Sequence, residues 1–399
     1  MLFVRILTDD RSAPDSRHTG SINLSSVIAL LIILVAVGLL FRRRRGLLPT
    51  ILIGLWLCMW IAIAVNTSGA SAETLREGVR EISIVALGVI VYNACPGVTM
   101  PAAARLVQFV GCIPALLAIY QLATGTGANI YGNIRAHGTF AHPNTAAMFF
   151  AIGATTSLWL YLDNGRRRAD ALLTTLFAVA LIATFSIDGP ITLAAMLTVL
   201  GVLRPGPLPA KLAPCAIAAV IMLVFFATPL GSKRIGRETH TSVSAAERGE
   251  TTSTLDTRLY RWKTLLPEWE RSPLVGQGLG VTTTAENTVA DPLNSLLPHN
   301  EYIRYLVETG VLGLAILLGA LFLLIRALTR KRRTSSALDA GAPNAPTLAL
   351  AVVAGCLVNS LADNTLLSSP TGYAAALIVV AVLALPGIEL QRAPSPQNA

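Results

Sequence analysis

The residues best suited to chemistry lie in one polar stretch, residues 231–301, between long apolar blocks. Arg258 and Arg261 are three positions apart and so share a face of a helix, where two guanidinium groups could grip one pyrophosphate through bidentate hydrogen bonds. His299 ends the stretch, and a histidine can accept a proton from a hydroxyl nucleophile. Simpler interpretations stay open: a headgroup-binding face for the arginines, and a structural hydrogen bond for the histidine.

The same polar stretch contains a predicted helix and a predicted turn. Residues 255–269 place apolar and aromatic side chains at near-helical spacing, which predicts an amphipathic helix along the membrane surface. Residues 272–280, SPLVGQGLG, hold three glycines and a proline. This composition favours a tight backbone turn close to a ligand or a helix.

The composition places these residues in a membrane protein. Hydrophobic residues make up 53% of the chain, charged residues 13%, and the mean hydropathy is +0.61, values that an ordinary soluble globule does not have. The net charge of +9 could suggest nucleic acid, but the arginines form short runs beside apolar blocks, where they orient helices. We therefore expect membrane lipids around the chain and no nucleic-acid partner.

The apolar blocks predict an all-α integral membrane protein, a polytopic bundle of about 11 (10 to 12) transmembrane helices. It carries one long outward-facing loop with short amphipathic helices. We divide it into an N-terminal tail (1–21), helices 1 to 8 (22–230), the periplasmic or extracellular loop (231–301), helices 9 to 11 (302–388) and a disordered tail (389–399). The expected spans lie near 22–41, 47–66, 82–95, 104–123, 144–162, 170–187, 190–203, 212–230, 302–328, 347–363 and 370–388.

Basic residues predict the side on which each loop lies, because short cytoplasmic loops are rich in Lys and Arg. With the run 42–45 inside, the alternating crossings bring the basic groups at 166–168, 204–211 and 330–333 inside as well. The same count sends three segments outward: 124–143, the turn at Asp188 and the long loop. We expect a multi-pass protein of the cell (inner) membrane whose site faces the periplasmic or extracellular side.

Metal binding is not expected. The five cysteines fall in or beside apolar spans without paired spacing, which indicates neither a disulfide framework nor a zinc site. His137 and His142 are five residues apart, but no carboxylate is near them in the sequence. We expect Asn144 to cap the helix that begins there. Asp363 and Asn364 fit a solvated helix end better than a sugar contact.

The order of these features resembles the O-antigen ligase and polymerase family of bacterial surface-polysaccharide enzymes. In the long loop and the helix after it, the resemblance rests on Arg258, Trp262, the turn 273–278, and His299-Asn300 followed by Gly310 and Gly313. The earlier segment 135–144, RAHGTFAHPN, is similar to a short arginine and His-Pro-Asn loop of that family. We assign residues 130–330 to the related region.

The resemblance implies a metal-independent, inverting membrane glycosyltransferase without a cofactor. Its donor would be an undecaprenyl-pyrophosphate-linked glycan and its acceptor a hydroxyl of a glycan or lipid, in O-antigen, capsule or exopolysaccharide assembly. Other polysaccharide-assembly proteins are further candidate partners. His299 and Arg258 would be catalytic, and Arg135, Arg258 and Arg261 would bind the pyrophosphate. The supporting residues would be Trp262, Asn300, Gly276, Gly278, Gly310, Gly313, His142 and Asn144.

Other interpretations remain at this stage. Asp188-Gly189 stands where relatives often have Ser-Arg, which weakens the case for a third arginine in a helix turn. A flippase for lipid-linked glycans or a polysaccharide exporter is the alternative function, although transporters usually place charges near the bilayer midplane and these spans have almost none there. A scaffold would leave the outward arginines unexplained. Polymerase and ligase share the motifs, so the sequence does not separate them.

Overall fold

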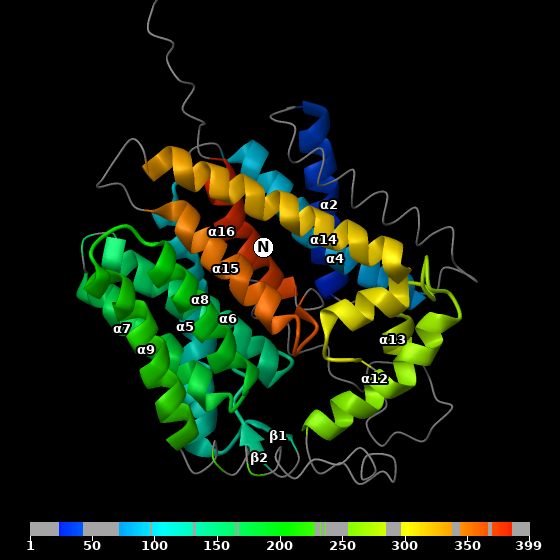
Figure 1. The fold of residues 1–399 in the computed structure, drawn as a ribbon, viewed down its shortest axis with the longest axis horizontal. Helices are drawn as coiled ribbons and strands as arrows, with labels where there is room; N and C mark the ends of the chain where they lie inside the picture. Colours follow the sequence, from blue (N-terminus) through cyan, green and yellow to red (C-terminus); the bar gives the residue numbers. More distant parts are fainter. Residues whose placement is uncertain are drawn as a thin grey trace, which may run out of the picture.

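The computed structural model is an almost entirely helical protein with one short hairpin (Figure 1). It describes residues 24–42, 72–95, 98–130, 133–163, 165, 167–227, 232, 236, 254–284, 297–336, 344–365 and 369–384. The helices are α2 (Leu24–Arg42), α4 (Ala72–Ala94), α5 (Met100–Thr124), α6 (Pro143–Asp163), α7 (Arg168–Ala183), α8 (Asp188–Leu203), α9 (Leu208–Ala227), α12 (Thr254–Glu270), α13 (Val281–Thr284), α14 (Glu301–Ser336), α15 (Ala345–Asn359) and α16 (Ser369–Leu383).

The helices follow the apolar blocks of the sequence. A described helix overlaps each expected span except 47–66, which lies outside the described residues, as do the tails 1–21 and 389–399. The helix predicted over 255–269 is present as α12. One feature was not predicted: β1 (Ala128–Ile130) and β2 (Asn133–Arg135) pair antiparallel within the segment 124–143.

Four described helices are long and apolar enough to cross a membrane: α5, α6, α9 and Glu301–Thr334 of α14. Shorter apolar helices accompany them, including α8, α15 and most of α16. Since a bilayer core needs roughly 20 apolar residues for one helical crossing, this set of helices supports a membrane protein. The number of crossings stays a prediction.

The core surrounds α6, which packs against α5, α7 and α8. Phe149, Phe150 and Trp159 of α6 are fully buried. Gly153 lets the ring of Phe177 from α7 lie directly on the α6 backbone, because any side chain there would collide with that ring. Close helix contact at small residues is the usual way that membrane helices gain packing energy.

Polar contacts gather at the helix ends. At one end, Arg204 after α8 pairs with Asp163 at 2.6 Å, and Arg332 of α14 donates to the Leu203 carbonyl at 2.8 Å. Arg105 of α5 pairs with Asp170 of α7 at the matching helix ends. Alternating crossings from the basic run 42–45 require these termini to meet on one side, and the structure brings them together. The candidate site lies at the opposite helix ends.

Candidate functional site

His299 forms the centre of the candidate site with an acidic partner from another helix end. Its Nδ1 lies 2.9 Å from Oδ1 of Asp363, in the turn after α15. The ring of His142, just before α6, is 6.4 Å away between centroids. His299 also has a φ of +48°, which is uncommon for a residue other than glycine. Such backbone strain is often found at functional sites.

Helix α12 holds the segment that carries His299. Arg261 donates to the carbonyl of Leu297 at 3.0 Å, and the Trp262 indole donates to the carbonyl of Pro298 at 2.7 Å. Asn300 accepts from the N–H groups of the first turn of α14 and donates to the Leu361 carbonyl at 3.1 Å. The residues on both sides of the histidine are therefore anchored, and Asn300 is the N-cap of α14.

Arg258 lies on the same helix but has a different partner. Its guanidinium pairs with the Asp188 carboxylate at 2.8 Å, and both side chains are largely buried. Asp188 begins α8, where a carboxylate is favoured by the helix dipole. Arg258 and Arg261 were expected to grip one anion together, but in this structure they hold separate partners. Asp188, noted in the sequence as a departure from relatives, neutralises Arg258.

Arg135 is buried behind the histidines. It donates to the Thr184 carbonyl at 2.8 Å and to Oδ1 of Asn144 at 2.8 Å. Asn144 also accepts from Ser186, so its side chain joins β2, α6 and the turn before α8. The prediction that Asn144 caps α6 was wrong, because Nδ1 of His142 accepts the Asn144 N–H instead, at 3.1 Å.

The environment sets the charge of two of these groups. Burial, together with the positive charges of Arg135 and Arg258, lowers the pKa of His142 to about 3, so this ring is neutral near pH 7. Burial opposes ionisation of Asp363, but the hydrogen bond from His299 and the positive charge of Arg258 favour the ionised form, and the pKa of Asp363 is held below its usual range. The site thus contains an ionised carboxylate next to His299.

The glycine turn lies against α14. Gly276 and Gly310 both have positive φ, and a side chain at either would collide with the backbone of the other segment. Gln277 N donates to the Val307 carbonyl at 2.8 Å and Gly278 N to the Glu308 carbonyl at 2.9 Å. Of the two predicted alternatives, ligand or helix, the structure shows contact with a helix. At Gly313 a side chain would collide with Thr309.

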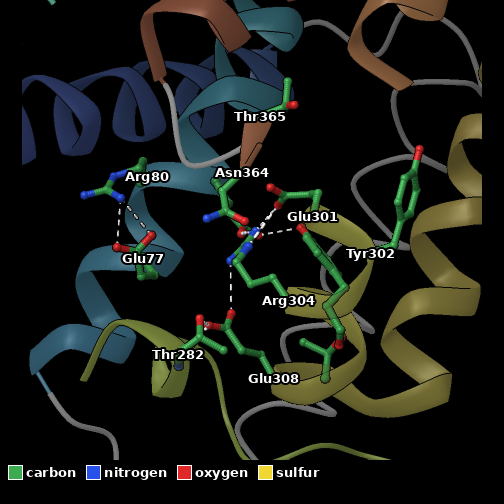
Figure 2. Close-up of polar contacts among 12 residues, drawn as sticks. Glu77, Arg80, Thr282, Glu301, Tyr302, Arg304, Glu308, Asn364 and Thr365 are labelled. Atoms are coloured by element: carbon green, nitrogen blue, oxygen red, sulfur yellow. Dashed lines mark hydrogen bonds and ion pairs between the residues drawn. The ribbon is translucent and has the colours of Figure 1, made fainter. Parts of the chain in front are cut away.

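A buried ionic cluster supports the start of α14 (Figure 2). Arg304, with no exposed surface, contacts three carboxylates: Glu301, Glu308 at 3.0 Å, and Glu81 of α4 at 2.5 Å. Thr282 of α13 donates to Glu308, so three helices meet at this cluster. The cluster could not be predicted from sequence spacing, because Glu81 and Arg304 are more than 200 residues apart.

Metal ligands do not converge here. Within the described ranges, no three histidine, cysteine, aspartate or glutamate side chains are placed to hold a metal ion. Nδ1 of His137 instead contacts the Phe140 carbonyl at 2.6 Å, within its own loop. Among the described residues, the site consists of arginine, histidine, aspartate and asparagine side chains that are paired with one another or with backbone carbonyls.

These features coincide with a family match. Residues 171–318 match a family model described as O-antigen ligase. The match confirms the predicted resemblance to the O-antigen ligase and polymerase family. Together with the apolar helices, it indicates a membrane protein with a glycosyl-transferring function of that type. A search of curated proteins finds no match.

The O-antigen ligase match covers most of the predicted site. It includes α12, the glycine turn, His299-Asn300 and Gly310 with Gly313. Arg135, His142, Asn144 and Asp363 lie outside it. Asp363 was expected to be a solvated residue at a helix end. The structure corrects this prediction, because Asp363 is the hydrogen-bond partner of His299. The one sequence signal for this role was that Asp363 falls on the same predicted side as the long loop.

Proposed function

We propose that the protein transfers a glycan from an undecaprenyl-pyrophosphate carrier to a hydroxyl of a glycan or lipid acceptor. The reaction would take place on the outer face of the inner membrane, in the assembly of a surface polysaccharide. The observation that carries the proposal is the His299–Asp363 pair beside Arg258, with both His299 and Arg258 inside the segment that matches the O-antigen ligase family.

The acceptor hydroxyl is activated by His299. Asp363 accepts only, because it is ionised, so Nδ1 of His299 carries the shared hydrogen and Nε2 is free to take a proton. The acceptor oxygen forms a bond to the anomeric carbon while its proton passes to Nε2. Direct displacement of the pyrophosphate inverts the anomeric configuration.

The departing pyrophosphate is stabilised by arginine. As the bond from the anomeric carbon to the pyrophosphate oxygen breaks, both electrons stay on that oxygen, and Arg258 lies on α12 to receive the charge. The pyrophosphate must first displace Asp188 from Arg258. Arg135 and Arg261 add positive charge nearby while holding backbone carbonyls, and neither a metal nor another cofactor takes part in the scheme.

The test is a transfer assay with the purified protein in lipid nanodiscs, using a radiolabelled undecaprenyl-pyrophosphate glycan and an acceptor glycan. His299→Ala and Arg258→Ala should abolish product formation at normal abundance. Arg271→Ala is the matched control, because Arg271 follows the same helix but is exposed and pairs only with Glu268 on the surface. Full activity in both site variants would refute the assignment.

An assay in cells distinguishes a polymerase from a ligase. Loss of a polymerase leaves single repeat units on the carrier, whereas loss of a ligase leaves long polymer on the carrier. The chain length of carrier-linked glycan in a His299→Ala strain therefore identifies the acceptor class.

A further inference from the structure

Helices α8 and α15 pack closely against each other (Figure 1). A side chain at Gly355 of α15 would collide with the side chain of Met196 on α8. Four residues later in α15, Nδ2 of Asn359 donates at 3.2 Å to Oγ1 of Thr192, which is four residues earlier in α8. Four residues are about one helical turn, a rise of about 6 Å. The two contacts therefore show an antiparallel pair of helices that are in register from one turn to the next.

The same register reaches the candidate site one turn further on. The backbone N–H of Asp363 donates to the Asn359 carbonyl at 2.8 Å, so the chain keeps its helical turn from the end of α15 to Asp363. On α8, Asp188 lies four residues before Thr192 and so occupies the same face of the helix. The register therefore places Asp363 level with Asp188, one turn beyond the Asn359–Thr192 bond.

Each of these two carboxylates holds one half of the candidate site. Asp188 pairs with Arg258, and Asp363 pairs with His299. Burial raises the pKa of Asp363, but the charge of Arg258 is among the interactions that lower it, so the two halves are close enough to interact. In the proposed function, Arg258 stabilises the departing pyrophosphate and His299 takes the proton of the acceptor hydroxyl. The packing of α8 on α15 therefore sets the distance between the groups that act on donor and acceptor.

The Asn359–Thr192 bond is buried. Thr192 has no exposed surface, and Asn359 is 2% exposed. Oδ1 of Asn359 accepts a hydrogen bond from Thr365 at 3.0 Å, which orients the amide so that its N–H group faces α8. If α8 slid along α15, the amide would lose Thr192, and a buried amide without a partner is costly. A single buried asparagine fixes the register of paired helices in the same way in coiled coils.

We propose that Asn359 is a positioning residue: its hydrogen bond to Thr192 fixes α8 against α15 and so sets the distance between the two halves of the candidate site. The inference rests on the proposed function. The acceptor oxygen approaches the anomeric carbon from the side opposite the departing pyrophosphate, so the proton acceptor and the anion-binding group must stand a fixed distance apart. Misplacement by about 1 Å can lower the rate of such a reaction about 10²-fold. Asn359 contacts neither substrate and acts through the two helix ends.

Removing the hydroxyl without changing the shape of the side chain tests the proposal. In the nanodisc transfer assay, Thr192→Val should lower kcat about tenfold or more with little change in KM, because each half of the site still binds its own substrate. Thr192→Ser keeps the hydroxyl and should recover most of kcat. Asn359→Leu tests the other side of the bond. Normal kcat in the folded Thr192→Val and Asn359→Leu proteins would overturn the proposal.

Thr155→Val is the matched control. Thr155 of α6 is also fully buried, and its hydroxyl contacts Sδ of Met196 on α8 at 3.4 Å. The same substitution therefore removes a polar contact of α8 without touching α15, and kcat should remain unchanged. A loss of kcat as large as that of Thr192→Val would mean that α8 needs only to be stable, which contradicts a positioning role for Asn359.

The reactivity of His299 gives a measurement that does not require turnover. Diethyl pyrocarbonate acylates imidazole nitrogens, and mass spectrometry of the full-length protein in nanodiscs gives the rate at His299, with His137 as the internal reference. Thr192→Val should loosen the His299–Asp363 pair and raise the acylation rate of His299 several-fold. A bond that only stabilises the fold would leave this rate unchanged in the folded protein, and that result would overturn the proposal.

The two measurements separate the positioning role from the proposed function. Absence of transfer by the unsubstituted protein would contradict the proposed function. The acylation rates of His299 in Thr192→Val and Thr155→Val would still decide whether the Asn359–Thr192 bond positions the site.

Discussion

Nδ1 of His299 lies 2.9 Å from Oδ1 of Asp363, although 64 residues separate the two in the chain. The hydrogen bond joins the start of α14 to the turn after α15. Because the Asp363 carboxylate is ionised, it orients the imidazole and selects its tautomer. Asp363 is therefore a positioning residue that acts through His299.

Asp363→Asn should lower kcat about 10²- to 10⁴-fold, the range of general acid–base catalysis, because an amide can donate to Nδ1 and so move the hydrogen to Nε2. KM for the donor should change little. Steady-state kinetics in nanodiscs check this, with Asp363→Glu expected to recover part of kcat. A change confined to KM or to protein abundance would leave Asp363 with a structural role only.

Asp188→Asn should increase donor affinity, because the pyrophosphate no longer competes with a carboxylate for Arg258. We expect KM for the donor to fall several-fold with little change in kcat. The double variant Asp188→Asn with Arg258→Ala is the control and should lose the gain. An unchanged or higher KM in the single variant would show that Asp188 helps to hold Arg258 in its working position.

Acidification should destabilise the protein through His142. Its pKa is about 3 in the folded protein against about 6.5 in an unfolded chain, so the unfolded state binds more protons between these values. The contribution of His142 to the free energy of unfolding is fully present above about pH 6.5. It decreases as the pH is lowered, by about 2 kcal/mol at pH 5. Melting curves in detergent from pH 7 to 5 measure this, and His142→Gln should flatten the dependence. Parallel curves for the two proteins would rule out His142 as the source.

Arg304→Met should destabilise the protein by about 3–5 kcal/mol, because it leaves Glu81, Glu301 and Glu308 buried without their cation. Thermal unfolding followed by tryptophan fluorescence measures the loss. Arg271→Met removes an exposed ion pair and should cost less than about 1 kcal/mol. Equal effects of the two changes would mean that the cluster contributes nothing beyond a surface pair.

Two glycines on α14 should respond in opposite ways to alanine. Gly310 has a φ of +66° and touches the Leu274 backbone, so Gly310→Ala should destabilise by about 1–3 kcal/mol or more. A side chain at Gly319 would meet nothing within 4 Å, so Gly319→Ala should be neutral or stabilise by up to about 1 kcal/mol. Melting temperatures of both variants check the contrast, which disappears if the glycine turn does not dock on α14.

Much of the fold could be read from local pattern. Long apolar blocks predicted the helices because a polar backbone must satisfy its own hydrogen bonds in a bilayer. The amphipathic spacing of residues 255–269 predicted α12, and the motif order from Arg258 to Gly313 pointed to the family whose model matches residues 171–318. The hairpin β1–β2 escaped prediction because three-residue strands carry too little pattern.

The sequence by itself determined which residue types the polar loop 231–301 contains: arginines that can bind an anion, and a histidine just before a helix. Only the tertiary structure decided their partners. Arg258 meets Asp188, His299 meets Asp363, and Arg304 gathers Glu81, Glu301 and Glu308. The contacts of Arg258 with Asp188, His299 with Asp363 and Arg304 with Glu81 join residues from separate elements. Their geometry depends on how the helices pack, which hydrophobic periodicity along one helix does not specify.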